Sequence, residues 1–178
     1  MFRILAAIGI GGALAGAAAG YYVQKRSPTE KRPGKPFANR IQGLEGLIYI
    51  VTGLSIFGLA FTGFWAALIR GQANTRYLLV VHCTLAPIFC LSLAATLVFC
   101  AQRYKFDKSD WRGVLRASGW RKVCFWVLMA AALPVILSMV LSMLPLWGTV
   151  GQEFLYQVHR GSTLILTMAA IGFIGLSR

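Results

Sequence analysis

The sequence predicts an all-α integral membrane protein, a bundle of four transmembrane helices preceded by one N-terminal transmembrane helix. Three observations predict this class. Of the 178 residues, 57% are hydrophobic, which is more than a soluble domain of this size can bury. The apolar residues fall into five runs, each long enough to cross a bilayer. Most of the basic residues lie between these runs rather than inside them.

The first apolar run covers residues 4–23. At about 20 residues it has the length of a transmembrane helix, whereas the apolar core of a signal peptide is shorter. We therefore expect residues 1–23 to form an N-terminal transmembrane helix. Gly12, Gly16 and Gly20 share one face of this helix, and small residues at that spacing let another helix approach closely. We expect this glycine face to pack against a partner protein, with the bundle itself as the alternative.

Residues 24–42 interrupt the apolar pattern with six basic residues and three prolines. Charge keeps such a segment out of the membrane and proline interrupts helices, so we expect a polar cytoplasmic linker. Residues 43–178 hold the remaining apolar runs, which predict the four-helix bundle. Its expected helices cover residues 44–69, 77–101, 123–147 and 154–176, with kinks at Pro87, Pro134 and Pro145.

Basic residues are distributed unevenly among the segments that connect the helices. Residues 24–42 carry six and residues 102–122 carry seven, whereas residues 70–77 carry two and residues 148–158 carry none. Because basic segments stay in the cytoplasm, both basic segments are expected there. The chain is then a multi-pass protein of the inner (cytoplasmic) membrane, with its N-terminus outside and its C-terminus in the cytoplasm. The net charge of +13 favours contact with anionic lipid over binding to nucleic acid.

The chain contains two histidines, His82 and His159, and both lie inside predicted membrane helices. Ionisable residues are rare in that setting and are candidates for a functional site. Each histidine follows the start of its predicted helix, Tyr77 or Phe154, by five residues, and both starts belong to the outer side. The two rings are therefore expected on different helices at one depth, roughly 7–8 Å below the outer boundary.

Two imidazoles at one depth can supply both axial ligands of a haem iron inside a helix bundle. Zinc, copper and non-haem iron need further ligands, which the sequence does not offer at that depth. Because the chain has no C-x-x-C-H sequence, the haem would be of the b type. Arg76 and Arg160 lie near the outer edge, where they could bind the haem carboxylates. The alternatives are interfacial anchoring for each arginine and a hydrogen bond between helices for each histidine.

Three stretches carry a resemblance to a known family: residues 76–89 (RYLLVVHCTLAPIF), residues 104–126 (YKFDKSDWRGVLRASGWRKVCFW) and residues 156–170 (YQVHRGSTLILTMAA). Residues 40–178 resemble the cytochrome b membrane subunits of respiratory formate dehydrogenases and nickel-iron hydrogenases. Those are four-helix proteins with two haems, which carry electrons between a peripheral enzyme and quinone. The N-terminal helix and the linker are extra to the family pattern.

The resemblance implies that His82 and His159 hold the outer of the two haems. It also implies that the second haem is missing. The family pattern puts one ligand of that haem in the segment 44–69, which has no histidine here, and the other 14 residues after His159, where this chain has Phe173. A relative with one haem is therefore expected.

These observations predict an electron-transfer subunit of a larger membrane redox complex. Its expected partners are the other subunits and lipid, with quinone as a further candidate ligand. A stand-alone enzyme is not predicted, because the sequence has no recognisable nucleophile–base pair. The alternative is a non-redox subunit that anchors or assembles a complex. Glu45, at the inner end of its helix, is expected to pair with a base such as Arg40, and proton transfer or partner binding is its less favoured role.

Overall fold

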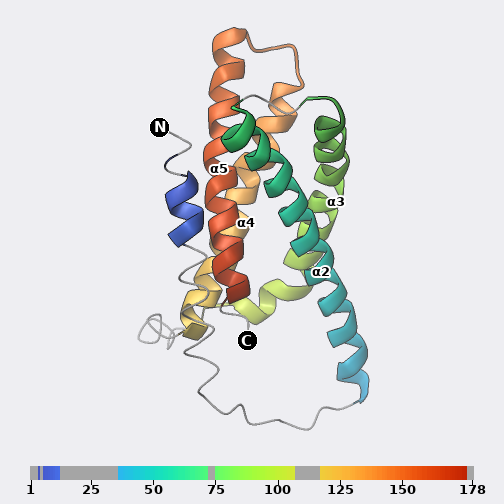
Figure 1. Cartoon of the computed structure of the whole chain (residues 1–178). Coiled ribbons are helices and arrows are strands. Elements are labelled where there is room, and N and C mark those ends of the chain that lie inside the picture. Colours follow the sequence, from blue (N-terminus) through green and yellow to red (C-terminus); the bar gives the residue numbers. More distant parts are fainter. Residues whose placement is uncertain (1–3, 5, 13–35, 72–74, 107–116, 176–178) are drawn as a thin grey trace. The chain divides into compact units, whose positions relative to one another are not determined.

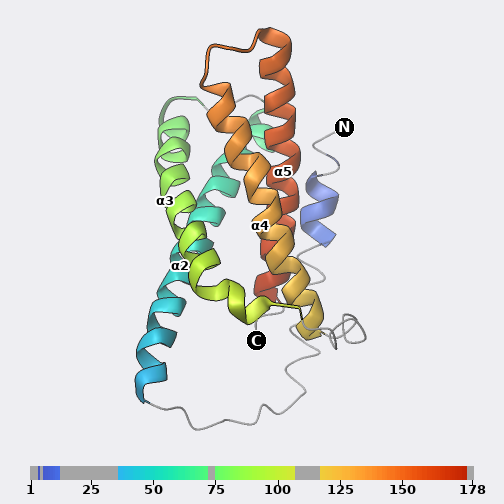
Figure 2. The same ribbon diagram turned by 180° about the vertical axis from the view of Figure 1, so that it is seen from behind.

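The computed structural model describes residues 4, 6–12, 36–71, 75–106 and 117–175. These residues are helical apart from short connections, and no strand occurs among them (Figure 1 and Figure 2). The chain divides into two compact units, Lys25–Lys105 and Met1–Gln24 together with Phe106–Arg178. Each unit is built around one pair of long antiparallel helices.

The first unit contains α2 (Pro36–Phe64) and α3 (Arg76–Cys100). Proline suits the first position of α2, because an N–H group there has no partner within the helix. The helix continues as a π-helical stretch, η1 (Trp65–Arg70), and stops at Gly71. Gly71 has a φ of 68°, a left-handed conformation that glycine adopts without steric penalty. We refer to this pair of helices as the α2–α3 hairpin.

The helices of the α2–α3 hairpin approach closely where a glycine leaves room. A Cβ atom at Gly58 would lie 2.6 Å from the Cδ1 atom of Leu85, which is too short for a van der Waals contact. Farther along the pair, the hydroxyls of Thr52 and Thr96 form a buried hydrogen bond of 3.0 Å. Close packing and polar bonds of this kind hold helices together in lipid, where apolar surface alone gives little driving force.

The second unit contains α4 (Ala117–Ser142) and α5 (Thr149–Gly175), which form the α4–α5 hairpin. Phe125 of α4 is 2% exposed, and its ring centroid lies 6.1 Å from that of Phe173 of α5. Buried aromatic pairs at this separation contribute strongly to packing. The contact fixes how the two helices meet at the end of α5.

Residues 6–12 form a helix that belongs to the same unit as α5. A Cβ atom at Gly9 would lie 3.0 Å from the sulfur of Met168 on α5. A Cβ atom at Gly12 would meet no atom within 4 Å. The start of this helix therefore packs on α5 through Gly9, which was not part of the predicted glycine face. The other two members of that face lie outside the described residues, at Gly16 and Gly20.

Among the described residues, four helical segments are long and apolar enough to cross a membrane, which supports the predicted all-α transmembrane class. Along them, many large apolar side chains are exposed, as lipid contact requires. The N-terminal span is described only at residue 4 and residues 6–12, so a fifth crossing stays a prediction, as does the packing of four helices into one bundle. The four segments are Gly43–Arg70, Arg76–Tyr104, Gly119–Ser142 and Thr149–Gly175.

Several helix ends differ from the prediction. The predicted kink at Pro145 is wrong, because α4 stops at Ser142 and this proline lies in the connection to α5. Proline cannot continue the ladder of backbone hydrogen bonds, so a helix commonly ends before it. Pro87 and Pro134 do lie inside helices. Three helices also begin earlier than expected: α2 at Pro36, within the predicted linker, α4 at Ala117 and α5 at Thr149.

Candidate functional site

His82 lies on α3 and contacts α2 through one ring nitrogen. Its Nδ1 atom is 2.7 Å from the hydroxyl oxygen of Thr62. The single hydroxyl proton of Thr62 is directed to backbone carbonyls of its own helix, Gly58 O at 2.8 Å and Leu59 O at 3.1 Å. In the tautomer that carries the proton on Nδ1, His82 donates to this hydroxyl oxygen and its lone pair lies on Nε2.

His159 lies on α5 and contacts α4 in the same manner. Its Nδ1 atom is 3.3 Å from the carbonyl oxygen of Val135 and 3.4 Å from the hydroxyl oxygen of Ser138. A carbonyl oxygen can only accept, and Ser138 directs its own proton to Val135 O at 3.0 Å. The Nδ1–H group of His159 is therefore the donor. Its neutral ring also carries the lone pair on Nε2.

The two hairpins thus share one arrangement around their histidines. In each, a buried hydroxyl on the first helix accepts from the Nδ1–H of a histidine on the second helix. The hydroxyl precedes the histidine by 20 residues in the α2–α3 hairpin and by 21 in the α4–α5 hairpin. These are interhelical hydrogen bonds, the alternative role that the sequence suggested.

The two histidines do not lie equally far from the starts of their helices. His82 follows the first residue of its helix, Arg76, by six residues, whereas His159 follows Thr149 by ten. Because α5 begins five residues before the predicted start at Phe154, equal distance from the helix starts no longer holds. The two histidines belong to different units, so the prediction that they face one another across a bundle stays a prediction.

One unsatisfied polar group shares the face of α5 that carries His159. One turn after His159, the hydroxyl oxygen of Thr163 is buried and has no hydrogen-bond partner among the described residues. Ser162 instead bonds to its own helix, at Val158 O. Gly161, where an added Cβ atom would meet no atom within 4 Å, lies two residues from His159 and therefore on another face of the helix. The hydroxyl of Thr163 is thus an orphaned polar atom beside His159 that a bound group could satisfy.

The two candidate arginines lie next to these histidines in sequence but in different settings. Arg76 is exposed and is the first residue of α3, with a φ of 51°. This left-handed conformation is costly for a residue with a Cβ atom. Arg160 is half-buried, and its guanidinium carbon lies 5.3 Å from the ring centroid of Tyr156, within range of a cation–π interaction. Binding of haem carboxylates by Arg76 and Arg160 stays a prediction.

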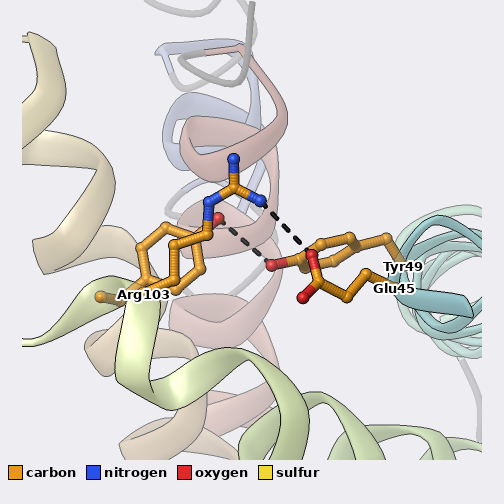
Figure 3. A network of polar contacts seen from close by, with 4 residues as sticks. Glu45, Tyr49 and Arg103 are labelled. Atoms are coloured by element: carbon orange, nitrogen blue, oxygen red, sulfur yellow. Dashed lines mark hydrogen bonds and ion pairs between the residues drawn. The ribbon is translucent and has the colours of Figure 1, made fainter. Parts of the chain in front are cut away.

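A polar cluster lies at the other end of the α2–α3 hairpin (Figure 3). Arg103 pairs with Glu45 at 3.4 Å, and the hydroxyl of Tyr49 donates to that of Tyr104 at 3.2 Å. Glu45 therefore pairs with a base, as expected, and the partner is Arg103; the side chain of Arg40 lies outside the described residues. The tyrosine pair was not expected, because no local pattern connects residues 55 positions apart.

Sequence reasoning also missed the buried hydroxyls that line both hairpins. Most of them donate to a carbonyl three or four residues earlier in their own helix, which is the usual way to satisfy Ser and Thr in an apolar setting. Thr62 and Ser138 differ from the other buried hydroxyl residues only in their separation along the sequence from a histidine, which is close to 20 residues. The buried hydroxyl residues are Thr52, Ser55, Thr62, Ser92, Thr96, Ser138, Ser162 and Thr167.

Within the described part of the chain, no group of three or more His, Cys, Asp and Glu residues is placed to hold a metal ion. The polar atoms near Nδ1 of each histidine are hydroxyl and carbonyl oxygens of the neighbouring helix. We compared the chain with models of protein families, with curated protein sequences and with solved structures, and none of the three comparisons found a match.

Proposed function

We propose that this chain is a membrane-embedded b-type cytochrome subunit, in which the Nε2 atoms of His82 and His159 ligate one haem. It would pass electrons between a partner redox subunit and quinone or another carrier within a larger membrane complex. The observation that supports the proposal is that Nδ1 of each histidine lies against an oxygen atom of the neighbouring helix, and these two histidines are the only two in the chain.

The tautomer matters because a metal takes the lone pair of a neutral imidazole. Histidines that bind metals almost always donate their other N–H to a carboxylate, a carbonyl or a similar oxygen, which orients the ring and makes it a stronger ligand. Both histidines have such a partner on the neighbouring helix. A haem iron needs only two protein ligands, whereas most other protein metal sites need at least three.

The other residues of the proposed site would hold and orient the macrocycle. Helices with this much apolar surface exclude water, and the guanidinium groups of Arg76 and Arg160 would pair with the haem carboxylates. The unpartnered hydroxyl of Thr163, one turn after His159 on the same face of α5, would be satisfied by a bound group there. The haem would supply one-electron redox chemistry.

Membership of the cytochrome b family that the sequence resembles is part of this proposal. That family binds its second haem 14 residues after the equivalent of His159, and this chain has Phe173 there. The Phe173 ring packs against Phe125, and the guanidinium of Arg121 lies 5.2 Å from its centroid. An aromatic side chain used in packing supports one haem instead of two.

A single haem near one surface cannot carry electrons through a bilayer. We therefore propose that the chain works beside another cofactor, as a subunit of the inner membrane with its haem toward the outer side. The competing proposal, a non-redox anchor or assembly subunit, is favoured by the same hydrogen bonds, since they also bind helices together.

The test is a spectrum of the purified protein, oxidised and then reduced with dithionite. We expect the bands of a low-spin b-type haem and one haem per chain by the pyridine haemochrome assay. Replacing His82 or His159 with alanine should remove the haem, because each would leave one axial position without a ligand. Thr84→Ala is a matched control, since this exposed residue of α3 bonds only to its own helix. A haem-free wild type would favour the anchor instead.

A further inference from the structure

We infer that Thr62 is the positioning residue that holds the ring of His82 and sets its strength as a haem ligand, with Ser138 as a weaker counterpart for His159. This inference rests on the proposed function. It concerns residues that do not touch the iron and act through the histidine.

The contact between Thr62 and His82 has the geometry of a strong hydrogen bond. At 2.7 Å it lies at the short end of the range for an N–H donor and an oxygen acceptor. Thr62 is 4% exposed, so water does not compete for its hydroxyl. In this dry setting the bond is electrostatically stronger than it would be in water.

The hydroxyl of Thr62 is held in place from its own side. Its proton is directed to the carbonyls of Gly58 and Leu59, which turns the oxygen lone pairs toward α3. The absence of a side chain at Gly58 lets Leu85 of α3 come within 2.6 Å of where a Cβ atom would stand. The side chain of Leu85 therefore packs on α2 one turn before Thr62.

The histidine of the other hairpin is held more loosely. His159 Nδ1–H is shared between Val135 O at 3.3 Å and the Ser138 hydroxyl at 3.4 Å. Both distances exceed the usual range for a strong bond. If the Ser138 hydroxyl is removed, the backbone carbonyl of Val135 remains as an acceptor. Ser138 should therefore matter less than Thr62.

An oxygen that accepts from Nδ1–H draws the proton away from the ring and raises the basicity of Nε2. A more basic ligand stabilises ferric iron relative to ferrous iron. Loss of the Thr62 hydroxyl should therefore raise the midpoint potential of the haem. It should also weaken haem retention by about 10- to 100-fold, the typical effect of losing a partner of a metal-ligating histidine.

The experiment compares five forms of the full chain: wild type, Thr62→Val, Thr62→Ser, Ser138→Ala and Thr96→Val. Redox titration and haem retention are measured for each, together with the ¹⁵N chemical shifts of the histidine rings in the haem-free protein. Thr96→Val is the matched control, because it removes a buried hydroxyl of the same hairpin that bonds to Thr52 and not to a histidine. We expect Thr62→Val to raise the potential and lose haem, Thr62→Ser to behave as wild type, and Ser138→Ala to show a smaller shift.

Several results would overturn the inference. The first is a Thr62→Val protein whose midpoint potential and haem retention equal those of wild type. The second is a Thr96→Val protein whose potential and haem retention change as much as those of Thr62→Val. If the valine variant does not accumulate, the ring shifts of the wild type decide, and a proton on Nε2 of His82 contradicts the assignment. A wild type without haem is a separate outcome, because it overturns the proposed function itself and this inference with it.

Discussion

The ring nitrogens of a histidine are chemically distinct, and here the packing of each hairpin decides which one carries the proton. Thr62 is the acceptor for His82, and the carbonyl of Val135 is the principal acceptor for His159. The carbonyl of Val135 can only accept, and the hydroxyl of Thr62 also lies within hydrogen-bond distance of two carbonyls of its own helix. The same hydrogen bond serves a histidine that bonds between helices and one that binds a metal, so the haem spectrum and not this contact separates the two proposals.

The ion pair between Glu45 and Arg103 is expected to contribute little to stability. The side chain of Arg103 is 64% exposed, and exposed ion pairs of this kind are worth about 0–1 kcal/mol because water and salt screen them. Glu45→Gln should therefore change the free energy of unfolding by less than about 1 kcal/mol.

Reversible unfolding in a detergent–SDS series measures this effect. Any small difference between Glu45→Gln and wild type should disappear as the salt concentration rises. A loss several times larger, or one that salt does not alter, would show that Glu45 has a role beyond this pair.

At the scale of the elements, each hairpin is held by a few close contacts between its helices. In the α2–α3 hairpin, a tight contact lies at Gly58, because an added Cβ atom would lie 2.6 Å from the Cδ1 atom of Leu85. Gly53 lies on the same helix, and an added Cβ atom there would meet nothing within 4 Å. The two glycines therefore form a matched pair for testing how closely the helices need to approach.

Gly58→Leu should separate α2 from α3, lengthen the bond between Thr62 and His82, and destabilise the protein by about 1–3 kcal/mol, the usual effect of overpacking. Gly53→Leu should remain close to wild type in both respects. Unfolding in SDS and the ¹⁵N shift of the His82 ring report the two effects separately. Equal behaviour of the two variants would mean that the close approach at Gly58 is not required.

Helix ends also belong to this scale. Proline marks one start and one stop: Pro36 opens α2, and α4 ends shortly before Pro145. By contrast, Pro87 and Pro134 are accommodated within helices, as happens in membranes when neighbouring groups satisfy the freed carbonyls. Prolines in the middle of an apolar run are therefore accommodated, whereas those near or beyond its ends mark the helix boundaries.

At the scale of the whole molecule, the four long apolar helices of the described residues are suited to cross a membrane, and the basic segments predict the orientation of the chain in it. Because residues 24–42 and 102–122 carry most of the positive charge, they should face the cytoplasm. The N-terminal span, if it crosses, then starts outside.

Labelling with a membrane-impermeant maleimide tests this orientation. The native Cys83, Cys90, Cys100 and Cys124 are first replaced by serine or alanine, and single cysteines are then introduced. From outside the cell, Thr75→Cys and Gly148→Cys should react, whereas Arg40→Cys and Lys105→Cys should react only after the membrane is opened. The reverse pattern would contradict both the orientation and the proposed outer position of the haem.

The sequence by itself determined the class of this protein and the identity of its candidate ligands. Apolar runs long enough to cross a bilayer are a local property, so four spans could be read directly, with errors only at ends that capping and prolines decide. Two histidines within such runs could likewise be recognised from their cost in lipid.

Tertiary structure alone decided how the histidines are held. The acceptors for His82 and His159 lie about 20 residues earlier on neighbouring helices, and nothing in a local pattern distinguishes Thr62 or Ser138 from the other hydroxyls in the spans. The pairing of Tyr49 with Tyr104 and of Glu45 with Arg103 was hidden for the same reason. Spacing along one helix shows which residues share a face, but the rotation and separation of two packed helices determine which atoms meet.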